Sequence, residues 1–124
     1  MKPTKALIKK RLKFLDDTVK FYNSNNRAIK PTGSCQYYIG KGKPGCAIGR
    51  HLLEKLAKSL DRMKNSSVNA ESVFNRLPKE LKDLGRGFLY KIQDLHDDDF
   101  CWDTHGLSRF GEGKVGDIKK EFCE

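Results

Sequence analysis

The chain lacks any long run of apolar residues, and this absence excludes several classes of protein. Lysines and an arginine between residues 9 and 13 interrupt the first apolar stretch, so the sequence predicts neither a signal peptide nor a membrane span. We therefore expect no membrane partner and a cytoplasmic location. Leu, Ile, Val, Phe and Tyr nevertheless recur along all 124 residues, which predicts a single folded domain over residues 1–124 rather than disorder.

Metal-binding spacings are also missing. No Cys-x-x-Cys pair occurs, and the series His96-x4-Cys101-x3-His105 matches no compact zinc motif. The acidic run 97–99 lacks the glycine and terminal glutamate of an EF-hand loop. We therefore expect no metal and no cofactor. The four cysteines allow two disulfides in three pairings, but free thiols are expected in a reducing compartment.

Positive charge is in excess: 25 lysines and arginines stand against 16 acids, for a formal net charge of +9. Such an excess favours an anionic partner, although dispersed lysines with acidic neighbours are also typical of a solvated surface. Lys5, Lys9 and Lys13 recur every four residues, which places them on one helix face. Non-specific nucleic-acid binding through this face is one alternative function, because no base-reading motif accompanies it.

The apolar pattern predicts a mainly α (α+β) fold, a compact helical domain with a small β or extended element near residues 35–40. Helices are expected over residues 4–23, 47–63, 70–76 and 78–84, and around Phe88 to Leu95. Four glycines in residues 103–116 predict a loop before a last short helix. The sequence identifies no partner for the extended segment at 35–39 and indicates no oligomeric state.

The glycine-rich segment 40–51 is the strongest candidate site. Its Gly-x-Gly-x-x-Gly pattern matches that of a dinucleotide-binding loop, but the sequence predicts no second strand after it. It is not a Walker loop either, because Gly45 is not followed by Lys and Ser or Thr. Lys41, Lys43 and Arg50, with His51 beside them, can hold a phosphate or carboxylate near the expected helix start. A turn shaped only for packing is the alternative.

Two aromatic residues complete the expected ligand-binding set. If the C-terminal half closes over the glycine segment, Trp102 packs near Tyr37 beside the cations, an arrangement that suits a nucleobase with its phosphates. The alternative is that both rings belong to the core.

Cys46 offers a different hypothesis, a cysteine-dependent enzyme. Cys46 falls in the first turn of the expected helix and near cations, and both features are expected to lower the pKa of its thiol. His96 or His105 would then be the base. Adjacent helix residues point in different directions, so Asp97 is not expected to orient His96. A buried, structural Cys46 is therefore favoured, and the chain is not expected to be an enzyme.

The motif Cys46-Ala-Ile-Gly49, followed by Leu89-x-x-Ile92-Gln-x-Leu95-His96-Asp97 and then Trp102, resembles small uncharacterised proteins of bacteriophages and bacteria. Those proteins pair a Cys-Ala-[Val/Ile]-Gly helix start with a leucine-rich helix that ends in His-Asp or Asn-Asp. The resemblance implies a non-catalytic intracellular binder that counters a host defence. We therefore predict a small phage-related protein that binds an anionic, nucleotide-like ligand or an acidic host protein.

Overall fold

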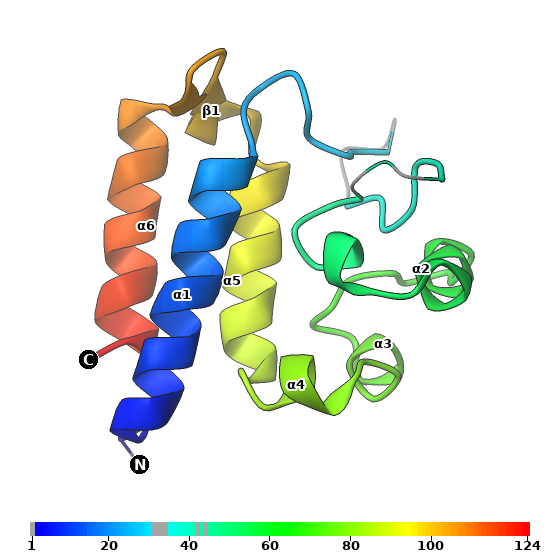
Figure 1. The fold of residues 1–124 in the computed structure, drawn as a ribbon, viewed down its shortest axis with the longest axis horizontal. Coiled ribbons are helices and arrows are strands. Elements are labelled where there is room, and N and C mark those ends of the chain that lie inside the picture. The colour runs from blue at the N-terminus through cyan, green and yellow to red at the C-terminus, as the bar shows by residue number, and fades with distance from the viewer. Residues whose placement is uncertain (1, 31–34, 42, 44) are drawn as a thin grey trace.

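The computed structural model describes residues 2–30, 35–41, 43 and 45–124. Three long helices lie side by side (Figure 1): α1 (Lys5–Phe21), α5 (Arg86–Asp97) and α6 (Arg109–Phe122). The other half carries short elements: η1 (Gly49–His51), α2 (Glu54–Asp61), α3 (Glu71–Phe74) and α4 (Lys79–Lys82). A 3-10 turn, η2 (Asp99–Cys101), and the antiparallel strands β1 (Trp102–Asp103) and β2 (Gly106–Leu107) connect α5 to α6. The predicted mainly α fold with a small β element is confirmed.

The longest helices, α1 and α6, begin where the sequence supplies side-chain caps. The Thr4 side chain accepts a hydrogen bond from the Leu7 N–H at the start of α1, and the Ser108 side chain accepts one from the Gly111 N–H at the start of α6. The α1 prediction is confirmed to within two residues at its C-terminal end. The loop predicted over 103–116 is wrong beyond Ser108, because α6 already begins at Arg109.

The glycines of α6 have different surroundings, which explains why a glycine-rich segment is helical. A Cβ at Gly111 would overlap the Cys101 carbonyl oxygen and lie 2.6 Å from Leu107 Cδ2, so close packing against η2 and β2 requires glycine there. Gly113 and Gly116 have no heavy atom within 4 Å of such a Cβ. Helical packing in this segment therefore outweighs the weak intrinsic helix propensity of glycine.

Alanine at either exposed glycine is expected to stabilise the protein. Gly113→Ala and Gly116→Ala should each raise the free energy of unfolding by about 0.5–1 kcal/mol, since alanine loses less backbone entropy in a helix. Urea denaturation would measure the change. Gly111→Ala is the matched control and should destabilise the protein; a loss of stability in the Gly113 variant would contradict the helical environment of that residue.

The helix predicted over 47–63 is interrupted. η1 ends at His51, Leu52 and Leu53 are extended, and α2 begins only at Glu54. A Cβ at Gly49 would overlap the Tyr37 carbonyl oxygen and lie 2.6 Å from Tyr37 Cα. Because η1 is held this close to the segment around Tyr37, the chain does not continue as a single helix, and Cys46 is not in the first turn of an α-helix.

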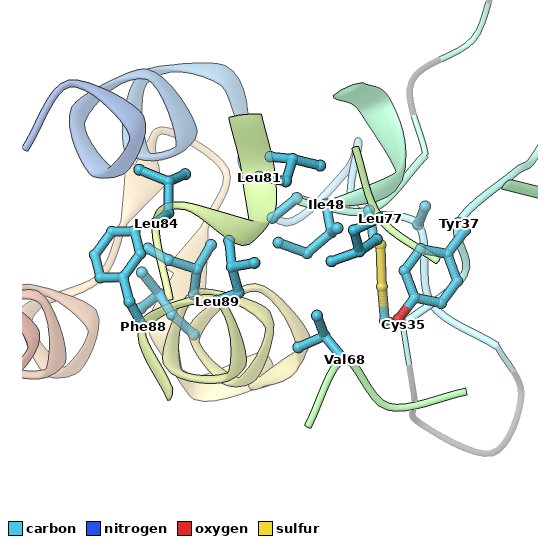
Figure 2. Packing of buried hydrophobic residues seen from close by; sticks show 14 of the residues in the cluster. Cys35, Tyr37, Ile48, Val68, Leu77, Leu81, Leu84, Phe88 and Leu89 are labelled. Carbon is cyan, nitrogen blue, oxygen red and sulfur yellow. A yellow bond between two sulfur atoms is a disulfide. The ribbon is translucent and has the colours of Figure 1, made fainter. Parts of the chain in front are cut away.

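One hydrophobic core connects the two halves (Figure 2). It includes Val68, Leu77, Leu81 and Leu84 from the short-helix half, and Phe88 and Leu89 from α5. Ile48, directly before η1, is fully buried in the same cluster. The candidate segment is therefore anchored in the core on one side.

Arg11 is a structural cation that joins α1 to both of its neighbours. Its Nε donates to the Leu84 carbonyl at 2.9 Å and its Nη1 donates to the Phe122 carbonyl at 2.9 Å. The guanidinium also lies 5.5 Å from the ring centroids of Phe88 and Phe122. This basic residue of the N-terminal cluster is therefore part of the packing between helices.

The extended segment around Tyr37 has its partner in residues 28–29. Ile29 and Cys35 form an isolated antiparallel bridge, and the Gln36 N–H donates to the Ala28 carbonyl at 3.0 Å. The Asp61 carboxylate then accepts from the Tyr37 N–H at 2.8 Å and from the Tyr38 N–H at 2.9 Å. The extended segment predicted near residues 35–40 is therefore present. The two paired strands, β1 and β2, lie elsewhere, at residues 102–107.

Candidate functional site

A disulfide ties the glycine-rich segment to the extended segment that precedes it. Cys35 and Cys46 are bonded, with Cα atoms 5.7 Å apart, and both are buried (Figure 2). The Cys46 N–H donates to the Gln36 carbonyl at 2.8 Å, and the Tyr22 hydroxyl donates to the Gly45 carbonyl at 2.7 Å. The prediction of free thiols is therefore wrong for this pair, because backbone pairing brings two cysteines together that the sequence separates by 11 positions. Cys101 and Cys123 are free.

The disulfide contradicts the hypothesis of a reactive Cys46. A sulfur already bonded to another sulfur offers no thiolate for attack on a substrate. The two proposed bases also differ in solvent exposure: His96 is fully buried, whereas His105 is exposed at the turn between β1 and β2. In this disulfide-bonded form Cys46 is therefore not the nucleophile predicted to act with His96 or His105.

His96 instead belongs to a buried polar cluster at the C-terminal end of α5. Its Nδ1 lies 2.8 Å from Asp97 Oδ1, so the expectation that adjacent residues cannot interact is wrong here. Burial raises the pKa of Asp97. Arg27, which sequence reasoning missed, donates from Nη1 to the His96 carbonyl at 2.8 Å and from Nη2 to Asp99 at 2.6 Å. Arg27 thereby offsets the negative charge at this helix end.

A hollow of about 610 Å³ lies beside this cluster. Asp94, Asp97 and Asp98 line it from the α5 side, and Lys64 lies in its opposite wall. Lys114 pairs with Asp94 at 3.2 Å and with Asp98 at 3.1 Å. Much of the negative charge of the hollow is therefore already neutralised within the protein. None of the predicted ligand residues lines this hollow.

The three predicted cations of the glycine segment do come together. Lys41, Lys43 and Arg50 line one depression of about 190 Å³, whose glycine lining includes Gly45 and Gly49. The two lysines are exposed and have no ion pair among the described residues. The carboxylate in the same lining belongs to Glu54, which is engaged by Lys58 and by the Tyr38 hydroxyl. The depression therefore presents uncompensated positive charge.

Arg50 connects this depression to a second one. Its guanidinium lies 4.4 Å from the centroid of the Phe21 ring, and its buried Nε has no hydrogen-bond partner in the described part of the chain. Arg50 also lines a shallow hollow of about 440 Å³ together with Asp17, Lys20, Phe21 and His51. Arg50 therefore lies between the depression lined by Lys41 and Lys43 and the C-terminal end of α1.

His51 contributes little positive charge at neutral pH. Its ring packs against Phe14, with centroids 4.8 Å apart. Although the residue as a whole is exposed, desolvation of its ring, with the nearby Arg50 charge as a second cause, lowers the pKa of His51 to about 4. The imidazole is therefore neutral at pH 7, and its expected role as a cationic ligand contact is not supported.

The depressed His51 pKa predicts a loss of stability in acid. Because the unfolded-state pKa is about 6.5, the unfolded chain binds more protons than the folded chain between that pH and about 4. Stability should therefore fall as pH decreases through this window, and His51→Gln should reduce the fall. Urea unfolding at several pH values would measure it. His105→Gln is the control and should show the same loss of stability with decreasing pH as the wild type. If the His51 variant lost as much stability in acid as the wild type, the role of His51 in this loss would be contradicted.

The two aromatic residues of the predicted set do not face a ligand. Tyr37 is 1% exposed; its hydroxyl donates to the Ser66 carbonyl and accepts from Gln93 Nε2. Trp102 is 5% exposed, packs against Tyr22, and donates from Nε1 to the Leu95 carbonyl. Tyr37 reaches the depression only as part of its lining, so neither ring can stack on a bound base. Phe21, the last residue of α1, is the aromatic residue beside Arg50.

No family model, curated protein or solved structure matches this chain. The resemblance to small phage and bacterial proteins therefore stays a prediction. In the described ranges, no group of three His, Cys, Asp or Glu residues is placed to hold a metal ion. Among the helices that the structure describes, none has the length and apolar character needed to cross a bilayer.

Proposed function

We propose that this protein is a binding protein that takes an anionic group, nucleotide-like in its phosphates, into the depression lined by Lys41, Lys43 and Arg50. The observation that carries the proposal is the convergence of these three side chains on one concavity. Among the described residues that line it, the one carboxylate, that of Glu54, is already paired. No catalytic step is assigned to the site.

The chemistry of the three side chains favours phosphate. An arginine guanidinium matches two phosphate oxygens at once, and a lysine ammonium adds a mobile point charge. The Arg50 guanidinium is already held over the Phe21 ring, so it loses little further freedom when a ligand binds. A depression of about 190 Å³ suits a phosphate or diphosphate group rather than a whole nucleotide. The rest of a larger ligand would extend past Arg50.

Calorimetric titration with pyrophosphate, adenosine triphosphate and a cyclic dinucleotide tests the proposal. We expect saturable binding to at least one of them and a loss of affinity of about tenfold or more in Lys41→Gln/Lys43→Gln, since two charge-assisted contacts are removed. Lys91→Gln/Lys119→Gln changes the net charge equally at exposed positions elsewhere and should bind as wild type. Flat titrations, or equal weakening in both variants, would overturn the proposal.

The phage origin, the counter-defence role, the acidic host protein and the cytoplasmic location belong to the same proposal and rest on the sequence resemblance and composition. A binder of this kind would act by sequestering a nucleotide signal or by covering a host protein. The titrations separate these two routes, because the first requires affinity for a small anion and the second does not.

A further inference from the structure

We infer that a single-stranded nucleic acid binds along α1, with its phosphodiester chain on a row of lysines and its path continuing over Arg50 to the glycine segment. At the Arg50 end of this surface the inference deepens the proposed function and rests on it, because both use Lys41, Lys43 and Arg50. The α1 part stands on separate residues.

The lysine row consists of Lys5, Lys9, Lys13 and Lys20. At 3.6 residues per turn these positions fall within a sector of about 80° on the helix, and all four lysines are exposed. One exposed acid, Asp16, falls in the same sector, so the row carries four positive charges against one negative charge. Among the described residues, the one ion pair in the row joins Lys13 to Asp17 at 2.9 Å, with both side chains largely in solvent. Exposed pairs of this kind contribute little and open readily to a competing anion.

The row joins the glycine segment without a break. Lys20 lines the shallow hollow that also contains Phe21, Arg50 and the carboxylate of Asp17, which is paired with Lys13. Arg50 in turn lines the depression with Lys41 and Lys43. Each adjacent pair of cations on this path therefore shares either a helix face or a hollow.

The length of the path indicates a chain rather than a small ligand. Lys5 and Lys20 are separated by 15 positions along a continuous helix, or about 22 Å. A mononucleotide or diphosphate reaches only one end of this path. A polymer with a charge on every unit can occupy all of it and releases counterions at each contact.

The surface composition favours nucleic acid over an acidic protein. Protein interfaces are built around buried apolar or aromatic anchors. Phe21 is the only large apolar residue of α1 that is exposed in the described structure, and it lies at the Arg50 end of the row. A phosphate backbone needs cations alone, and the Phe21–Arg50 stack offers a flat surface on which an unpaired base can lie. This last feature selects a single strand.

Fluorescence anisotropy with labelled oligonucleotides of about 20 nucleotides tests the inference with the full-length protein. Single-stranded DNA and RNA should bind, and log affinity should fall linearly with log salt. In Lys5→Gln/Lys9→Gln/Lys20→Gln the affinity should fall at least tenfold, and the slope should lose about 2 units, because each lost phosphate contact removes about 0.7. A duplex of the same length should bind more weakly.

The control variant Arg62→Gln/Lys91→Gln/Lys119→Gln removes three exposed cations from other elements. It should keep the wild-type slope, and circular dichroism should show both variants folded. Equal weakening in the control, or no binding at low salt, would overturn the inference. Equal affinity for duplex would overturn the assignment to single strands.

The two proposals fail separately. Pyrophosphate binding without any effect of the α1 substitutions on oligonucleotide affinity would refute the lysine row and leave the glycine-segment site. Oligonucleotide binding that depends on α1, together with flat pyrophosphate titrations, would refute the small-anion site and leave the row.

Discussion

Gly49→Ala should destabilise the protein by about 3 kcal/mol or more. A Cβ at this position would overlap the Tyr37 carbonyl oxygen and lie 2.6 Å from Tyr37 Cα. Both are backbone atoms, and the Tyr37 N–H is held by Asp61. Relief of the overlap therefore requires η1 and the extended segment to separate, which would open the core around Ile48.

Chemical denaturation followed by circular dichroism measures this effect, and failure of Gly49→Ala to fold is its upper limit. Gly113→Ala makes the same chemical change in open space and should be slightly stabilising. If Gly49→Ala were as stable as wild type, the close approach of η1 to Tyr37 would be refuted. The consequence for function is direct, because Gly49 also lines the depression with Lys41 and Lys43.

Reduction of the Cys35–Cys46 disulfide should lower stability by about 3 kcal/mol. The bond closes a loop of about ten residues, and in the chain-entropy account its removal frees the unfolded chain by roughly this amount. For a domain of this size the melting temperature should fall by roughly 10 °C. Anion binding should weaken as well, because Lys41 and Lys43 lie within the closed loop.

Thermal unfolding with and without dithiothreitol measures the effect. Cys35→Ser/Cys46→Ser should melt near the reduced wild type and respond no further to the reductant. Cys101→Ser/Cys123→Ser keeps the disulfide and should retain the full response. A wild-type melting temperature that dithiothreitol leaves unchanged would show that the bond contributes nothing to stability.

Local patterns predicted much of the helical structure. The first helix was expected over 4–23 and occupies Lys5–Phe21, and the two short helices and α5 lie where they were expected. These elements form where the apolar residues recur with helical spacing, and α1 has a polar N-cap, Thr4, as well. Both signals lie within a few residues of each other in the sequence. The extended segment near Tyr37 was also anticipated, although its partner at residues 28–29 was not.

The two errors in the fold both concern glycines in contact with distant backbone. Gly49 interrupts the expected second helix because it packs on Tyr37, and Gly111 fits inside α6 because it packs on Cys101. A glycine in sequence indicates freedom of the backbone. It does not indicate whether that freedom is used for a turn or for close packing within a helix, because the decisive atoms come from elsewhere in the chain.

The sequence by itself determined the charge of the candidate site and the residue types in it: Lys41, Lys43 and Arg50 were identified and do share a depression. Only the tertiary structure decided which neighbours accompany them. Burial removed Tyr37 and Trp102 from the ligand set, and disulfide formation removed Cys46 as a nucleophile. Packing of Arg50 on Phe21 connected the glycine segment to the lysines of α1. Charge is a property of each residue, whereas exposure and proximity depend on contacts between segments that are far apart in the sequence.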